Sequence, residues 1–155
     1  MDDISVDDPR APDVRALLTR HLAFVHAQSP PEDVHALDVD GLLDPAVTFF
    51  SLRHDDELIA VGALKRLDDH RAEVKSMHTV EALRGRGIAS AMLRHLVDVA
   101  QAAGYLRLYL ETGTGPAFAP ARALYAKAGF LSCGPFDDYE DSPYSCFWTL
   151  DLSVS

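Results

Sequence analysis

Three strand-like runs separated by short acidic turns constrain the fold of this chain more than any other feature. Residues 47–52, 58–64 and 72–80 are rich in apolar, β-branched and aromatic side chains, which is typical of strands in a half-buried sheet. Asp55-Asp56-Glu57 and Asp68-Asp69-His70 separate the runs. Strands joined by turns this short pair antiparallel. The centre of the chain is therefore predicted to form an antiparallel meander.

Helical patterns lie on both sides of the meander. Residues 12–28 repeat apolar side chains at roughly helical spacing until Ser29-Pro30-Pro31 ends the pattern, because the residue before a proline disfavours helix. Residues 34–43 fit a short second helix or a turn. Residues 88–103 and 120–128 are each followed by a glycine, the residue that most often ends a helix. Four helical segments are therefore expected, two before the meander and two after it.

Further strand-like segments complete the order of elements. They are residues 4–6, 106–111, 130–133 and 146–150. The predicted order is one strand, two helices, three strands, a helix, a strand, a helix and two strands (βααβββαβαββ). This order describes a mixed α/β fold with a central, mostly antiparallel sheet flanked by helices. A length of 155 residues suits one domain, residues 1–155.

The charge pattern argues against nucleic acid as a partner. The chain carries a net charge of −10, whereas duplex binding depends on many cationic contacts to phosphates. Its cations concentrate in residues 71–94, where five Lys or Arg side chains accompany two glutamates. One basic segment in an acidic protein suits a single small polyanion.

Other features of the sequence concern location and metals. No apolar run approaches the roughly 20 residues of a membrane span, and the start Met1-Asp2-Asp3 lacks the basic and apolar regions of a signal peptide. The two cysteines, Cys133 and Cys146, have no metal-like spacing,. We therefore expect a cytoplasmic protein with no membrane partner and no metal.

A glycine-rich turn between a strand and a helix is the strongest chemical signal. Thr79-Val80 ends a predicted strand, Arg84-Gly85-Arg86-Gly87 follows, and Ile88 begins a predicted helix. A helix N-terminus presents unpaired N–H groups and a positive dipole end to an anion, and glycines let the backbone approach it closely. The same glycines also fit a tight turn with no ligand. Their spacing matches neither a dinucleotide fingerprint nor a Walker loop.

Two segments resemble motifs of the GCN5-related N-acetyltransferases (GNAT). Arg84-x-x-Gly87-x-Ala89 resembles the family's pyrophosphate motif, and residues 121–130 resemble its A-x-x-L-Y-x-K-x-G-F segment. The resemblance extends over nearly the whole chain and includes a sparsely characterised bacterial branch. It implies the GNAT fold, acetyl-CoA as co-substrate, and direct transfer of the acetyl group to a primary amine of a small molecule or peptide.

The resemblance also implies which residues bind acetyl-CoA. They lie at the end of one strand, in the turn, at the start of the helix and beside the second motif: Met77, His78, Thr79, Val80, Arg84, Gly85, Arg86, Gly87, Ile88, Ala89, Ser90, Phe118 and Ala121. Many relatives carry Asn where Phe118 stands. A side-chain contact to the co-substrate is therefore lost or replaced at this position.

Transfer to an amine requires a base. Glu73 is predicted to serve, because it lies on the strand before the turn, placed like the catalytic glutamate of the family. A carboxylate between apolar walls would have a raised pKa. The structural alternative is a solvated acid facing Lys75 or Arg71. Glu111 and His78 are competing candidates for the base.

Transfer also requires donors for the oxyanion and for the leaving thiolate. Tyr125 matches the tyrosine that the family uses near the CoA sulfur, and it is predicted to donate to the thiolate. Its alternative is packing within a helix. The backbone N–H of His78 is the candidate oxyanion donor.

Fewer signals concern the acceptor. Asp137-Asp138-Tyr139-Glu140-Asp141 is an acidic run that fits either a solvated loop or attraction of a cationic amine. We expect Glu32, His35, Glu111 and Tyr139 to contact the acceptor. A homodimer is an expectation from the family. The alternatives to an N-acetyltransferase are a CoA-binding sensor without turnover and an O-acyltransferase that uses another acyl-CoA.

Overall fold

The computed structural model describes residues 2–28 and 39–153. Its elements are β1 (Asp2–Val6), α1 (Pro12–Gln28), α2 (Val39–Leu42), β2 (Val47–His54), β3 (Glu57–Arg66), β4 (Arg71–Thr79), the 3-10 helix η2 (Glu81–Leu83), α3 (Ile88–Ala102), β5 (Arg107–Gly113), the 3-10 helix η3 (Pro116–Phe118), α4 (Ala119–Lys127), β6 (Leu131–Cys133) and β7 (Ser145–Asp151).

The order of strands and α-helices confirms the order predicted from the sequence. Most boundaries differ from the prediction by one or two residues. Of the helix predicted at residues 34–43, the first half lies outside the described residues, and α2 is the part that is seen.

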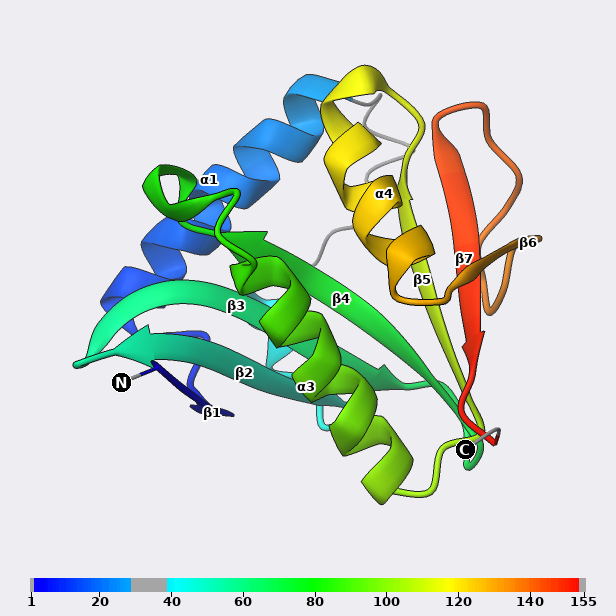
Figure 1. Cartoon of the computed structure of the whole chain (residues 1–155), viewed down its shortest axis with the longest axis horizontal. Coiled ribbons are helices and arrows are strands. Elements are labelled where there is room, and N and C mark those ends of the chain that lie inside the picture. The colour runs from blue at the N-terminus through cyan, green and yellow to red at the C-terminus, as the bar shows by residue number, and fades with distance from the viewer. Residues whose placement is uncertain (1, 29–38, 154–155) are drawn as a thin grey trace.

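The strands of the described residues form one sheet with the order β1-β2-β3-β4-β5-β7-β6. Neighbouring strands are antiparallel except β4 and β5, which are parallel. The chain reaches β5 from β4 through α3, because a parallel neighbour needs a crossover. Figure 1 shows α3 crossing the sheet in front of β3 and β4, with α4 beside β5. The predicted mixed α/β fold with a mostly antiparallel sheet is confirmed.

Two apolar clusters, one on each face of the sheet, hold the helices in place. The first packs α3 against the middle strands through Leu64, Val74, Met92, Leu93, Leu96 and Leu108, among others. The second packs α1 and α2 against the opposite face through Val14, Leu17, Leu18, Leu42, Phe49, Val61 and Ala63, among others. Each fully buried side chain of this size contributes about 1.5–3 kcal/mol relative to exposure.

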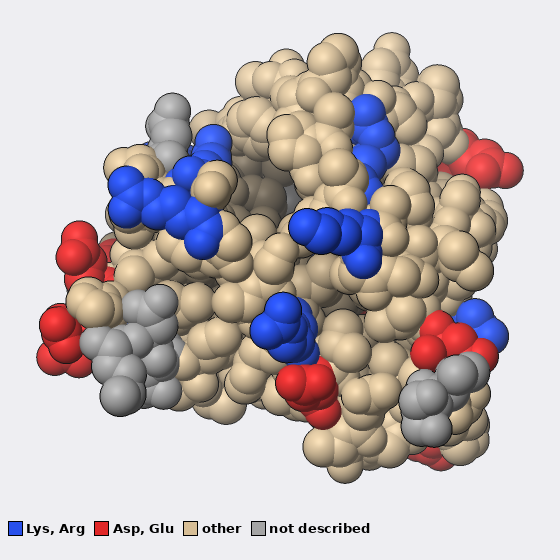
Figure 2. All heavy atoms as spheres, viewed as in Figure 1, with Lys and Arg blue, Asp and Glu red and all other residues tan. Residues whose placement is uncertain are grey.

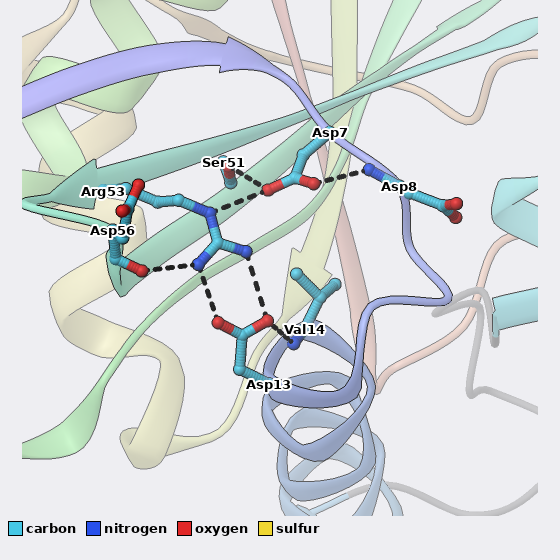
Figure 3. Close-up of polar contacts among 7 residues, drawn as sticks. All are labelled: Asp7, Asp8, Asp13, Val14, Ser51, Arg53 and Asp56. Carbon is cyan, nitrogen blue, oxygen red and sulfur yellow. Dashed lines mark hydrogen bonds and ion pairs between the residues drawn. The ribbon is translucent and has the colours of Figure 1, made fainter.

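A network around Arg53 fixes the start of α1 to β2 (Figure 3). The Arg53 guanidinium donates to both carboxylate oxygens of Asp13, at 2.6 and 3.1 Å, and through Nε to Asp7 Oδ2 at 3.0 Å. The fully buried Ser51 hydroxyl donates to the same Asp7 oxygen at 2.5 Å. Hydrogen bonds from Arg53 lower the pKa of Asp13. This network sets the position of α1, which lines the site described next.

Candidate active site

The sheet opens between its parallel strands, β4 and β5. These strands pair at three positions, the last of which is Glu73 with Tyr109, although both strands continue beyond it. A cavity of about 460 Å³ occupies the opening. Residues of α1 line it from one face of the sheet, and residues of α3 and α4 line it from the other. The opening therefore joins the two faces at the centre of the fold.

One end of the cavity is the N-terminus of α3. Gly87 is its N-cap residue, with φ of 77°, and Gly85 has φ of 81°, a region that strains other residues. Within residues 2–28 and 39–153, no side chain caps the helix, and no heavy atom beyond the adjacent residues lies within 4 Å of a Cβ built on either glycine. Figure 2 shows Lys and Arg side chains gathered over η2 and the start of α3, beside a hollow. This end is suited to an anion.

β4 is distorted where it borders the cavity. Its register against β3 shifts between Val61 and Ala63, and Ser76 adopts φ of 57°. The Ser76 hydroxyl is buried, and it has no hydrogen-bond partner among the residues that the structure describes. An unpaired buried hydroxyl costs free energy, and strained backbone clusters at binding sites. The bulge in β4 therefore combines a strained backbone with an unpaired hydroxyl at the cavity wall.

Two histidines share one hydrogen bond beside the bulge. Nδ1 of His78 on β4 lies 3.2 Å from Nδ1 of His21 on α1, and Nη2 of Arg84 lies 3.4 Å from Nε2 of His78. Arginine can only donate, so neutral His78 accepts through Nε2 and carries its proton on Nδ1. It then donates to His21. Burial, with the neighbouring positive charge of Arg84, lowers the pKa of His21 to about 4.

The same causes act on His78. Burial lowers its pKa to about 3, with further contributions from His21 and Arg84. Both imidazoles are therefore neutral near pH 7. His78 meets the condition for a base less well than the sequence suggested, because a base needs a pKa close to the working pH.

Tyr125 lies at the cavity wall opposite β4. Its side chain extends from α4, is 8% exposed and packs edge-to-face on Phe130. Burial, with the nearby carboxylate of Glu111, raises the pKa of Tyr125 to about 12. The hydroxyl therefore stays protonated and able to donate at every pH near neutrality.

Glu73 belongs to a buried polar cluster with Lys75 and Tyr139. Its Oε2 accepts hydrogen bonds from the Tyr139 hydroxyl at 2.5 Å and from Lys75 Nζ at 3.2 Å. Lys75 Nζ also lies 2.9 Å from the Tyr139 oxygen. The Glu73 and Lys75 side chains are 2% and 8% exposed. Burial and the Glu73 carboxylate raise the pKa of Tyr139.

This cluster corrects the expected surroundings of Glu73. The apolar walls predicted around the carboxylate are replaced by an ammonium group and a phenol, and the solvated alternative is excluded by the burial of the side chain. The predicted contact with Lys75 is present. Glu73 is therefore a buried, hydrogen-bonded carboxylate at the end of the cavity where β4 and β5 separate.

Phe118 lines the cavity and packs against α1. Its ring lies edge-on to Phe24 of α1, with centroids 5.4 Å apart. A Cβ on Gly113 would lie 2.3 Å from Phe118 Cδ2, so this ring requires glycine at the end of β5. Arg122 holds the same turn by donating to the carbonyl oxygens of Gly113 and Gly115, each at 2.9 Å.

Most of the residues predicted from the sequence meet at this cavity. Those that line it are Glu73, Met77, His78, Thr79, Arg84, Gly85, Gly87, Ile88, Ala89, Ser90, Glu111, Phe118, Ala121, Tyr125 and Tyr139. Val80 is not brought to the cavity wall: it packs toward the α1 cluster, and its N–H donates to Ile59. Arg86 is exposed outside the lining. Glu32 and His35 lie outside the described residues.

Sequence reasoning missed several residues of the cavity wall. His21 and Phe24 line it from α1, where the apolar pattern predicted only packing. Lys75 was considered only as a partner of Glu73. Nothing local in the sequence marks His21, because its partner His78 lies 57 residues away.

The described residues offer neither a metal site nor a membrane span. No three His, Cys, Asp or Glu side chains within residues 2–28 and 39–153 are grouped so that they could hold a metal ion. None of the described helices is long and apolar enough to cross a membrane.

Comparison with known proteins assigns the chain to a family. The sequence profile described as "Acetyltransferase (GNAT) family" matches residues 11–130. The chain is 47% identical over 149 residues to uncharacterized N-acetyltransferase YedL of Escherichia coli, covering 96% of this chain and 94% of that protein. It is 43% identical over 149 residues to uncharacterized N-acetyltransferase YsnE of Bacillus subtilis, covering 96% and 99%.

Solved structures show the same fold. A GNAT family acetyltransferase from Elizabethkingia anophelis with acetyl-CoA bound superposes with a TM-score of 0.71 at 19% sequence identity, and the match covers 97% of both chains. The chain therefore belongs to the GNAT family of acetyltransferases and is an acyl-CoA-dependent transferase.

Proposed function

We propose that this protein is an N-acetyltransferase that moves an acetyl group from acetyl-CoA directly to a primary amine. One observation carries the proposal: the cavity between β4 and β5 has an anion-binding helix end on one side and the buried Glu73 cluster on the other. A co-substrate with phosphates at one end and a thioester at the other fits this arrangement, because the phosphates would lie at the helix N-terminus and the thioester near Glu73.

The residues at the cavity fit acetyl-CoA. Gly85 and Gly87 leave the space of a Cβ open in front of α3, where the backbone N–H groups and Arg84 would bind phosphate. The bulge at Ser76 supplies a buried hydroxyl that has no hydrogen-bond partner among the described residues. Acetyl-CoA supplies the activated acyl group, and the protein supplies the binding and the proton transfers.

Tyr125 and Glu73 are proposed to act on the two sides of the reacting carbon. In the transfer, a bond forms between the amine nitrogen and the acetyl carbon while the carbon–sulfur bond breaks. The Tyr125 hydroxyl donates a hydrogen bond to the sulfur, because its raised pKa keeps it protonated. The proton lost by the amine passes to Glu73, through the Tyr139 hydroxyl that already donates to it or through water,.

The acidic lining at the reacting end favours an amine as the acceptor. Glu73 and Glu111 line the cavity from neighbouring strands, and carboxylates attract an ammonium group. The acceptor is proposed to be a small molecule or the end of a peptide, because the cavity has a volume of only about 460 Å³ and residues of several helices and strands surround it.

A product assay tests the proposal. The purified protein is incubated with acetyl-CoA and a panel of amines and amino acids, and the products are identified by mass spectrometry while free thiol is measured in parallel. Thiol release matched by acetylated amine supports an N-acetyltransferase. Thiol release without an acetylated amine, or no release with any amine, would contradict it.

A further inference from the structure

A second, smaller hollow adjoins the cavity at the Glu73 cluster. It measures about 190 Å³ and is lined by Lys65, Glu73, Lys75, Asp137, Asp138 and Tyr139. Three of these residues, Glu73, Lys75 and Tyr139, also line the large cavity. The two spaces therefore meet at the side chains proposed to accept the proton.

The sheet face that packs under α1 changes from apolar to charged at this hollow. Ala63 on β3 packs in the apolar cluster under α1, and Lys65, two residues along the same strand, lies on the same face. Lys65 is directly opposite Glu73 in the register of β3 and β4. Glu73 is already paired with Lys75.

Lys65 carries a positive charge in a hollow that the carboxylates of Glu73, Asp137 and Asp138 also line. Its ammonium group makes no hydrogen bond or ion pair within the part of the chain that the structure describes, and its side chain is half-buried. Asp137 and Asp138, which also line the hollow, are exposed, so water screens their charge, and the carboxylate of Glu73 is already bonded to Lys75 and Tyr139. A half-buried ammonium group at a cavity wall is suited to binding an anion.

We infer that the acceptor amine also carries a carboxylate, which Lys65 binds in the small hollow. The inference rests on the proposed function and specifies its substrate class. The ammonium end of such an acceptor extends past Tyr139 toward Glu73 and Glu111, where the charge is negative. The carboxylate end stays with Lys65. Opposite charges at the two ends fix one orientation, with the amine directed into the large cavity.

Matched acceptor pairs test this inference. Phenylalanine is compared with phenethylamine, 4-aminobutyrate with propylamine, and lysine with cadaverine, because the members of each pair differ only in a carboxylate. The wild-type protein is expected to show a higher kcat/KM for the carboxylate-bearing member of the pair that it accepts. Lys65→Met should remove this preference, lowering kcat/KM about 10- to 100-fold for that member alone, with the KM for acetyl-CoA unchanged.

Arg66→Met is the matched control. Arg66 is the next residue on β3, so its side chain is on the opposite face, where it pairs with Asp69. This variant should keep the preference. Lys65→Glu gives a further check, since it should favour cadaverine over lysine.

The outcomes separate this inference from the proposed function. Acetylation of amines without preference for the carboxylate-bearing members would overturn the inference and leave the N-acetyltransferase intact. Equal losses on both members of a pair in Lys65→Met would also overturn it, because a purely structural lysine gives that result. Absence of transfer to any amine would overturn both.

Discussion

The hydroxyl of Tyr139 donates a 2.5 Å hydrogen bond to the carboxylate of Glu73, across a separation of 66 residues in the chain. The contact joins the β6–β7 connection to the first part of β4, at the position where β4 and β5 cease to pair. Lys75 completes the cluster by donating to the Tyr139 hydroxyl oxygen and to Oε2 of Glu73. One buried carboxylate is thus both a structural link and the proposed proton acceptor, and its two roles can be separated by mutation.

Glu73→Gln is expected to lower both stability and turnover. The substitution removes the negative partner of Lys75 and leaves a buried ammonium group, which typically costs about 3–5 kcal/mol. Loss of a general base typically lowers the rate by ~10²–10⁴-fold. Thermal unfolding and steady-state kinetics measure the two effects.

The double variant Glu73→Gln/Lys75→Met separates the loss of stability from the loss of turnover. Removing the ammonium group together with the carboxylate should restore most of the stability, but not the turnover. Recovery of turnover along with stability would mean that Glu73 acts only through the fold, and the role of base would pass to Glu111 or to water.

Tyr125→Phe is expected to lower kcat with little change in the affinity for acetyl-CoA. The hydroxyl stays protonated because the pKa of Tyr125 is raised to about 12, and its hydrogen bond strengthens only as charge develops on sulfur. The ring and its packing on Phe130 are kept, so the melting temperature should change little. A rise in KM with an unchanged kcat would assign Tyr125 to binding alone.

Gly87→Asp is expected to abolish CoA binding, measured by isothermal titration calorimetry. The new carboxylate would lie at the N-terminus of α3, where phosphate is proposed to bind. Gly87→Asn adds the same shape without the charge and should bind more weakly than wild type but measurably. Gly104→Asn is the control for backbone strain, since Gly104 also has positive φ and open space around its Cβ position, but follows the other end of α3. Normal binding by Gly87→Asp would contradict the phosphate site.

The stability of the protein is expected to fall as the pH decreases from about 6.5 toward 4. The folded state lowers the pKa of His21 from 6.5 to about 4 and that of His78 from 6.5 to about 3. In this window the unfolded chain binds more protons than the folded chain, so acid favours unfolding. The contribution of the pair is fully present above pH 6.5.

Thermal unfolding at pH 7 and pH 5 measures this effect. The pH dependence should be smaller in His21→Gln/His78→Gln, and it should persist in His70→Gln, which changes an exposed histidine on the turn before β4. An unchanged pH dependence in the double variant would assign the loss of stability to other groups.

Local patterns in the sequence predicted the elements, and the resemblance to the GNAT family predicted much of the cavity wall. Strand and helix boundaries follow from periodicity and turn residues, which act over a few positions. The glycine-rich turn, Glu73 and Tyr125 could be assigned because motif residues on successive elements meet where β4 and β5 separate.

Contacts between distant segments could not be predicted in this way. Tyr139 reaches Lys75 across 64 residues, and His21 reaches His78 across 57. Both contacts depend on where the sheet opens and on how α1 and the β6–β7 connection lie over it. The apolar surroundings predicted for Glu73 were wrong for the same reason, since the contact between Tyr139 and Glu73 spans 66 residues.

Acetyl-CoA is proposed to bind in the opening between β4 and β5, with its phosphates at the start of α3. Titration of the isotopically labelled protein with CoA, followed by amide chemical shifts, tests it most directly. If CoA binds in this opening, the largest changes in amide chemical shift are expected at residues 84–89 and in the bulge of β4 around Ser76. Changes confined to β1 and β2, on the far edge of the sheet, or no changes with CoA in excess, would contradict it.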